Sequence, residues 1–297
     1  MIAFDFNICF NDEPSLDDGL YRDTKESISL FKSDDPALFE QLVVKSEYMP
    51  LSGREACYGA MQRYSECETG CLWGVDVKDL VQFVWRRGEH SIYYHTEERC
   101  TPELLQFWTL HTIIPMMLSL DQTYSILHVG AVTIGDAAII FSADSFGGKS
   151  TLTDYFLRKG HRLLSDDTLG VYEDENRFLA VASYPFHRPF RSAESLGYKV
   201  SEVVETPKVI KAVYLLERAD AKAAVAISEV QGVEKYKALH FSTFIDFDFL
   251  KKSTFSKMSA FVNVTPVYRV TVPWEIVRLE AVYKSICKHS GVTESAP

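Results

Sequence analysis

Residues 137–160 constrain the fold more than any other part of this chain, because they join an apolar run, a glycine-rich loop and a helix. Residues 137–141 predict a buried strand, and residues 151–159 predict a helix that Gly160 ends. The loop between them closes on Gly-Gly-Lys-Ser at residues 147–150. In such an arrangement, backbone N–H groups and the positive end of the helix converge on an anion. The segment therefore predicts a binding loop for the phosphates of a nucleotide.

The residues of this loop have separable tasks. Lys149 can reach the β- and γ-phosphates, and the Ser150 hydroxyl can complete the coordination shell of Mg²⁺. We predict that ATP, or another nucleoside triphosphate, binds with Mg²⁺ to Asp144, Ser145, Phe146, Gly147, Gly148, Lys149, Ser150 and Thr151. Ala143 stands where the usual pattern begins with glycine, which indicates a variant loop. A chance turn before an ordinary helix is the alternative.

Two adjacent carboxylates follow the predicted helix. After Gly160 comes a short apolar strand, and Asp166 and Asp167 stand at its carboxyl end. Side chains of neighbouring strand residues point to opposite faces, so one acid can hold a metal while the other accepts a proton. For an isolated Asp-Asp pair, a solvated turn is the simpler interpretation. Beside a phosphate loop, the pair predicts a catalytic and metal-binding role.

The order of these motifs resembles a known family. A His-containing strand at residues 127–132 precedes the phosphate loop, and Gly160-His161-Arg162-Leu163 precedes the two acids. An aromatic, proline and basic segment follows at residues 184–190. This order is similar to the kinase domain of HPr kinase/phosphorylase and its relatives. Within that family, the chain resembles the serine kinases of lasso-peptide precursors more than HPr kinase itself.

The resemblance implies an α/β fold with a phosphoenolpyruvate carboxykinase-like P-loop kinase core and a mixed sheet. It also implies that a nucleoside triphosphate phosphorylates a serine hydroxyl of a peptide or protein. Carried over by position, Asp166 and Asp167 serve catalysis and metal binding, Lys149 and Ser150 serve the phosphates and Mg²⁺, and His128 lies close to the transferred phosphate. The sequence does not distinguish which aspartate is the base, and we assign that role to Asp166, with Asp167 and Ser150 as metal ligands. The family implies a homo-oligomer. The carboxyl-terminal signature for the reverse, phosphorylase reaction is not recognisable here.

Several candidate residues keep a structural alternative. A histidine in an apolar strand is commonly a hydrogen-bonded core residue, and His128 fits that description as well as a catalytic one. Arg188 and Arg191 can clamp a phosphate or a carboxylate bidentately, which makes them candidates for substrate binding. A loop whose arginines are solvated is the alternative for both.

Composition and charge narrow the class of protein. The formal charge of −10 over 297 residues argues against nonspecific nucleic-acid binding, which needs cations to neutralise phosphates. No apolar run is long enough to span a bilayer, so we expect no membrane partner and a cytoplasmic location. The six cysteines form no zinc pattern, and we expect them to be reduced.

We predict two domains. Residues 1–100 mix short alternating runs with acidic turns and predict a small β-rich domain that serves substrate recognition. Residues 101–297 predict the kinase domain, beginning with a helix that Thr101 caps. Hairpins are expected at 124–141 and 169–182.

Further elements are expected along the second domain. They are a strand near 213–216, a helix near 233–239, a strand at 266–270 and a terminal helix at 273–287.

Three functions fit these observations. The leading one is an ATP- and Mg²⁺-dependent kinase that phosphorylates an alcohol, most simply a serine of a peptide or protein. The second is a kinase of a free small molecule, such as an amino acid or a sugar. The third is a nucleotide-binding module without catalysis, for which Asp166 and Asp167 have no evident use.

Overall fold

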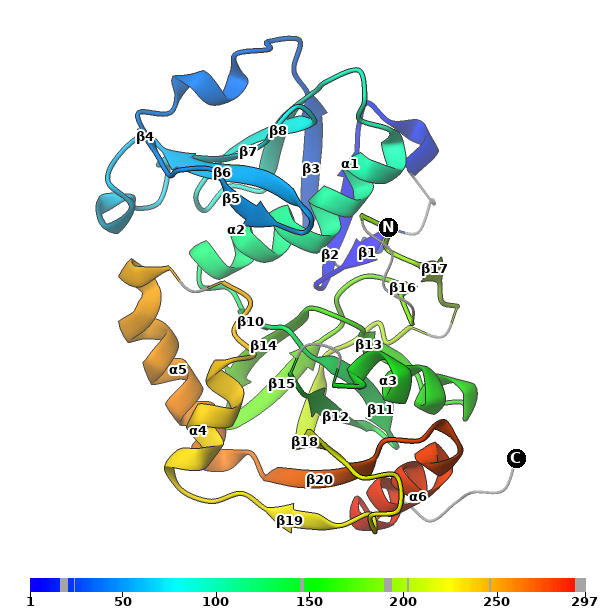
Figure 1. The fold of residues 1–297 in the computed structure, drawn as a ribbon. Coiled ribbons are helices and arrows are strands. Elements are labelled where there is room, and N and C mark those ends of the chain that lie inside the picture. The colour runs from blue at the N-terminus through cyan, green and yellow to red at the C-terminus, as the bar shows by residue number, and fades with distance from the viewer. Residues whose placement is uncertain are drawn as a thin grey trace. The chain divides into compact units, whose positions relative to one another are not determined.

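The chain divides into two compact units. The computed structural model describes residues 1–16, 21–23, 25–144, 147–189, 194–201, 203–245 and 247–291 (Figure 1). The first unit comprises Met1–Thr123 and Arg191–Leu196, and the second comprises Tyr124–Phe190 and Gly197–Pro297. Sequence analysis places a domain boundary after residue 100, just before Thr101, which caps the first α-helix of the first unit. Both units contain sheets, and the fold is mixed α/β.

The described residues of the first unit form a nine-stranded sheet in the order β1-β2-β3-β9-β8-β7-β6-β4, with β5 paired to β6. The strands are β1 Ile2–Ala3, β2 Phe6–Phe10, β3 Ser27–Lys32, β4 Val44–Lys45, β5 Met49–Leu51, β6 Arg54–Ala60, β7 Leu72–Val77, β8 Val81–Arg86 and β9 Ser91–Thr96. Short 3-10 helices lie at Pro14–Leu16, Leu38–Gln41 and Tyr64–Glu66. Fully buried aromatic side chains, including Trp73, Trp85 and Phe83, fill the core of this unit.

A broken helix follows the sheet. It consists of α1 (Pro102–Trp108), a π-helical turn (Thr109–Ile113) and α2 (Ile114–Leu120). The Thr101 side chain accepts a hydrogen bond from the Leu104 N–H, which confirms the predicted cap. Pro115 lacks an N–H and stands in the first turn of α2, so the π turn absorbs the break in the hydrogen-bond ladder.

One disulfide corrects the expectation that all cysteines are reduced. Cys67 and Cys71 are bonded, with their Cα atoms 5.4 Å apart. The turn that follows the 3-10 helix at Tyr64–Glu66 places the two residues within ordinary disulfide reach. The spacing of the cysteines in the sequence argued against a zinc site, but it could not show that Cys67 and Cys71 lie close enough to form a disulfide. The other four cysteines, all among the described residues, are not disulfide-bonded.

The second unit has a mixed sheet in the order β10-β14-β15-β18-β12-β11-β13, with β20 paired to β18 and β19 to β20. The strands are β10 Ser125–Leu127, β11 Gly130–Ile134, β12 Ala137–Ser142, β13 Leu163–Ser165, β14 Leu169–Asp174, β15 Arg177–Val181, β18 Lys208–Ala219, β19 Ile227–Glu229 and β20 Val267–Pro273. A separate pair joins β16 (Phe186–His187) to β17 (Tyr198–Lys199).

Strand direction in this sheet decides where the site lies. β18 runs parallel to both β12 and β20, and β11 is antiparallel to both β12 and β13. Consequently β20, β18, β12 and β13 all point the same way, and their carboxyl ends meet at one edge of the sheet. Ligands of α/β proteins bind in the crevice outside that edge.

Helices cover both faces of this sheet (Figure 1). They are α3 Lys149–Arg158, α4 Val233–His240, α5 Lys251–Val264 and α6 Leu279–His289, with 3-10 turns at Asp248–Leu250 and Ile276–Arg278. Alternate residues of β12 face opposite ways: Ile139 and Phe141 pack with residues of α3 and α6, and Ala138 and Ile140 pack with residues of α4 and α5. This alternation produces one apolar core on each face.

Most predicted elements of the second unit are present. The hairpins turn at Gly135, with a φ of +58°, and at Glu175 and Asn176, both with positive φ. The terminal helix begins at Leu279 rather than 273, because β20 extends to Pro273. Sequence analysis missed α5, whose buried stripe is narrow and consists of Met258, Phe261 and Val262. No helix within the described ranges is long and apolar enough to cross a membrane.

Candidate active site

The glycine-rich loop connects the carboxyl end of β12 to the first residue of α3. Gly148 caps the helix with a φ of +93°, and the Gly147 N–H donates to the Asp144 carbonyl at 2.9 Å. A Cβ atom added to Gly147 would lie 2.6 Å from the Cβ of Ala143. Glycine is therefore required at position 147 by close packing, although alanine occupies the position where the usual pattern begins with glycine.

Lys149 and the start of α3 form the cationic side of this loop. The Lys149 side chain is buried, with the residue 8% exposed, and its Nζ donates to the Ala143 carbonyl at 2.9 Å. Ser150 and Thr151 follow it in the first turn, where backbone N–H groups have no partner within the helix. Ser145 and Phe146, predicted to contact the nucleotide, lie outside the described residues.

A close approach joins α3 to the strand beside the acids. A Cβ atom on Gly130, the first residue of β11, would lie 2.5 Å from Thr153 Oγ1 and 3.8 Å from the Lys149 Cβ. The next residue, Ala131, pairs with Ser165 of β13. The glycine-rich loop and the acidic pair are therefore separated by a single strand.

Asp167 contacts two other residues predicted from sequence, His128 and Arg188. His128 Nδ1 lies 3.1 Å from Asp167 Oδ1, and Arg188 Nη2 donates to Asp167 Oδ2 at 3.1 Å. Asp167 is buried, with the residue 9% exposed, and His128 is half-buried, with its side chain 29% exposed. Arg191, the second predicted substrate-binding arginine, lies outside the described residues.

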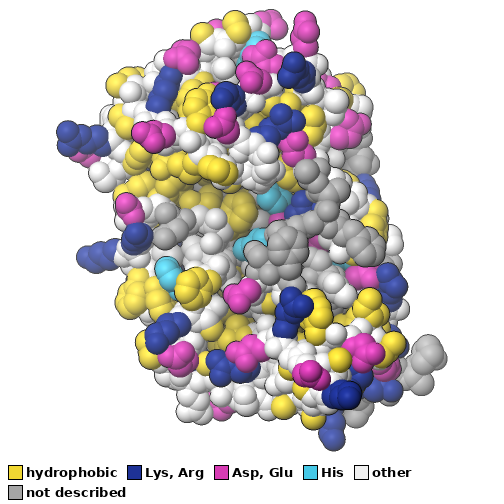
Figure 2. Space-filling view, viewed as in Figure 1, with side chains coloured by type: hydrophobic (Ala, Val, Ile, Leu, Met, Phe, Trp, Pro, Cys, Tyr) yellow, Lys and Arg dark blue, Asp and Glu magenta, His cyan; other side chains and the backbone are white. Residues whose placement is uncertain are grey.

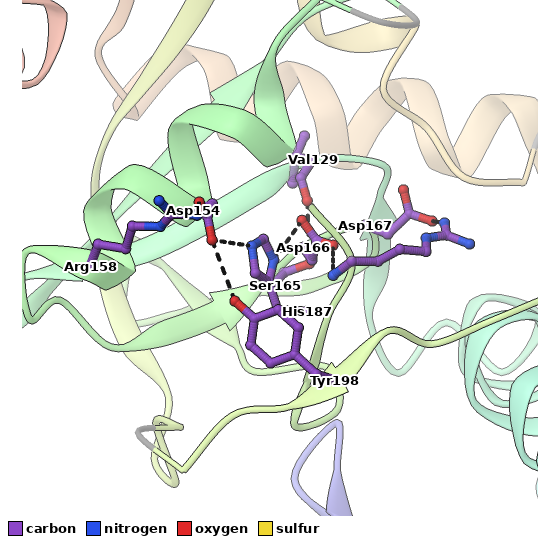
Figure 3. Close-up of polar contacts among 9 residues, drawn as sticks. Val129, Asp154, Arg158, Ser165, Asp166, Asp167, His187 and Tyr198 are labelled. Atoms are coloured by element: carbon purple, nitrogen blue, oxygen red, sulfur yellow. Dashed lines mark hydrogen bonds and ion pairs between the residues drawn. The ribbon is translucent and has the colours of Figure 1, made fainter. Parts of the chain in front are cut away.

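Asp166 is held by the segment that follows β15 (Figure 3). Its Oδ2 accepts the backbone N–H of Arg188 at 2.7 Å, and its Oδ1 lies 3.2 Å from His187 Nδ1. His187 is fully buried, and its Nε2 lies 3.4 Å from Asp154 Oδ1. These distances place the imidazole within ion-pairing reach of both carboxylates, without the alignment of full hydrogen bonds.

The second carboxylate that His187 contacts, Asp154, belongs to α3. It pairs with Arg158 at 2.7 Å and accepts a hydrogen bond from the Tyr198 hydroxyl at 3.3 Å. The network therefore runs from α3 through His187 to Asp166. Sequence reasoning included His187 in the motif at residues 184–190 but assigned it no role. It missed Asp154, which belongs to no motif.

Tyr184 lies under the acidic pair. Its burial, together with the negative charges of Asp167 and Asp166, raises the pKa of its hydroxyl. The Tyr184 phenol therefore stays neutral even at pH values at which a free tyrosine begins to ionise.

A pocket of about 290 Å³ lies beside the glycine-rich loop, on the side of β12 away from the acidic pair. Its lining includes Gly147, Gly148 and Thr151 from the loop, and Trp274 and Ile276 from the segment after β20. Sequence analysis did not find this pocket, because its two walls are more than a hundred residues apart in the chain.

The donor set suits a magnesium ion that is shared with a nucleotide. Within the residues that the structure describes, no three His, Cys, Asp or Glu side chains converge as a protein-only metal site. Mg²⁺ commonly uses one or two protein oxygens plus phosphate oxygens and water. Ser150 and Asp167 supply oxygens of that kind.

On the face drawn in Figure 2, basic side chains are interspersed with acidic ones.

Comparisons with known proteins add little to this geometry. No family model and no curated protein matches the chain. Among solved structures, the chain is similar to the Hpr(Ser) kinase/phosphatase from Coxiella burnetii, with 11% identity and a TM-score of 0.33. That similarity covers 56% of this chain and 99% of the other. A similarity of this size supports no inference about shared activity.

Proposed function

We propose that the second unit is a phosphotransferase that moves the γ-phosphoryl group of ATP to an alcohol, and that the acceptor is a serine of a peptide or protein. One observation carries the proposal. The phosphate loop after β12 and the buried acidic pair after β13 lie at the same edge of the sheet, one strand apart. A phosphoryl donor held by the loop would thus have carboxylates beside its transferable end.

The chemistry assigns a task to each residue. Lys149 and the N–H groups at the start of α3 bind the phosphates. Asp166 accepts the proton of the acceptor hydroxyl, and the oxygen of that hydroxyl attacks the γ-phosphorus. The bond from that phosphorus to the bridging oxygen breaks, and ADP leaves.

Ser150 and Asp167 would hold Mg²⁺, which neutralises charge on the β- and γ-phosphates. His128 and Arg188 orient the Asp167 carboxylate, since each contacts one of its oxygens. Arg188 also places a permanent positive charge beside the acids, where it can offset the negative charge of the transferred group.

The test is transfer of labelled phosphate from γ-³²P-ATP to peptides that contain serine, with alanine-substituted peptides and free amino acids and sugars alongside. Asp166→Asn should lower kcat by about 100-fold or more, which is the usual contribution of a general base, with little change in the KM for ATP. Asp174→Asn is the matched control, because Asp174 is an exposed carboxylate at a hairpin of the same unit.

Each outcome decides between alternatives. Transfer by Asp166→Asn at the wild-type rate would show that Asp166 is not the base. Label appearing only on free amino acids or sugars would replace the peptide acceptor with a small molecule. ATP binding without any transfer would leave a nucleotide-binding module, and absence of ATP binding would overturn the proposal entirely.

A further inference from the structure

The proposed chemistry leaves the pocket beside the glycine-rich loop unused. It shares Gly147, Gly148 and Thr151 with the loop, and the rest of its wall comes from the ends of β18 and β20 and from the start of α6. Its volume of about 290 Å³ is just below the range for small-molecule sites, about 300–1,000 Å³. The pocket therefore suits a ring system rather than a peptide.

Trp274 is the aromatic side chain of this pocket, and its position is fixed from several sides. Its backbone N–H donates to the Ala219 carbonyl at 3.0 Å, and the Arg218 guanidinium carbon lies 3.6 Å from its ring centroid. A Cβ atom on Gly148 would lie 3.3 Å from the ring edge. The residue is nevertheless 44% exposed. A tryptophan that is held in place but left half exposed offers an aromatic surface to a ligand.

The strand order places this pocket relative to the acids. Across the sheet, β20 and β18 lie on one side of β12, and β11 and β13 lie on the other. The pocket is at the ends of β18 and β20, whereas Asp166 and Asp167 follow β13. A nucleotide whose phosphates occupy the loop has its γ-phosphate at one end and its base at the other. An acceptor hydroxyl must reach Asp166, so the acceptor does not fit this pocket.

We propose that this pocket is the nucleobase subsite and that the base of a purine nucleoside triphosphate stacks on Trp274. The inference rests on the proposed function, because it assumes that phosphates bind the loop. Aliphatic side chains of Leu216, Ile276 and Leu279 complete the apolar surroundings of the base. Purines present a larger ring surface than pyrimidines, so ATP and GTP should bind more tightly than CTP and UTP.

The tryptophans of the chain provide a direct readout. Trp73, Trp85 and Trp108 belong to the first unit and are fully buried, and Trp274 alone belongs to the second. We expect ATP to quench the long-wavelength emission of the full-length protein, and inorganic tripolyphosphate to bind without quenching it. Trp274→Ala should abolish the quenching.

Calorimetry then separates the contribution of the base to nucleotide binding from that of the phosphates. Trp274→Ala should raise the Kd for ATP by about 5- to 150-fold, the range expected when stacking on an aromatic side chain is lost. It should leave the Kd for tripolyphosphate unchanged. Trp274→Phe should retain most of the affinity, and Val277→Ala is the matched control, because Val277 is exposed and adjacent but does not line the pocket.

Two results would overturn the subsite. One is equal affinity of the wild-type protein for ATP and tripolyphosphate, which needs no variant and so does not depend on folding. The other is an unchanged Kd for ATP in Trp274→Ala. Failure of both ATP and tripolyphosphate to bind would instead overturn the phosphate site and the proposed function. Tighter binding of CTP than ATP would refute the purine preference.

Discussion

Removing the imidazole of His187 tests whether the network behind the acids stabilises the second unit. His187→Leu keeps a side chain of similar bulk at a fully buried position but removes both ring nitrogens. Its two nitrogens lie 3.2 Å from Asp166 Oδ1 and 3.4 Å from Asp154 Oδ1, within ion-pairing reach of both carboxylates. The substitution leaves two carboxylates of low exposure facing an apolar group.

The expected magnitude follows from what each carboxylate retains. Removing one partner of a buried ion pair costs about 3–5 kcal/mol, because the remaining charge is uncompensated. Asp166 keeps the Arg188 N–H at 2.7 Å, and Asp154 keeps the Arg158 guanidinium at 2.7 Å. We therefore expect His187→Leu to lower the free energy of unfolding by about 3 kcal/mol, the lower end of that range.

Equilibrium unfolding in urea, followed by circular dichroism, measures this loss. With a slope of about 3 kcal/mol per molar urea, a loss of about 3 kcal/mol lowers the midpoint by about 1 M. Arg158→Ala is the control on the same carboxylate. The Arg158 side chain is 71% exposed, so its removal should cost less than about 1 kcal/mol.

A double-mutant cycle isolates the interaction itself. Asp154→Asn removes one of the two carboxylates, so it should be less costly in the His187→Leu background than in the wild-type protein. The difference should be about 0.5–3 kcal/mol, the usual range for residues in one network. Strictly additive effects, or a loss below about 1 kcal/mol for His187→Leu, would refute the argument that His187 joins α3 to Asp166.

Two further predictions concern the loop and a second histidine. Gly147→Ala places a Cβ atom 2.6 Å from the Ala143 Cβ, so the Kd for tripolyphosphate should rise by calorimetry, whereas Gly135→Ala at a distant turn should leave it unchanged. Burial lowers the pKa of His161, whose Nδ1 lies 2.9 Å from the Thr133 carbonyl. The unfolded chain therefore binds the proton more readily, and the contribution of His161 to stability is complete above about pH 6.5 and is lost as pH falls below it. His161→Gln should flatten urea midpoints measured between about pH 5 and 7, and an unchanged slope would contradict the assignment.

Several features of the second unit could be predicted from residues close together in the chain. Glycine and lysine at 147–150, between an apolar run and a helix, were sufficient for the loop and α3. Gly135 located one hairpin turn, and the apolar run before Asp166 located β13. These predictions succeeded because backbone preferences and side-chain periodicity act over a few residues.

Other features depended on which distant segments meet. β18 lies between β15 and β12, and this order places Trp274 beside a loop that ends more than a hundred residues earlier. In the same way, β16 carries His187 to Asp154 of α3. Local sequence sets which residues form a strand or a helix, but strand order and burial are decided by packing over the whole unit. The acidic pair and the glycine-rich loop were therefore evident from sequence. The contact of His187 with the acidic pair and the pocket of Trp274 beside the loop required the tertiary structure.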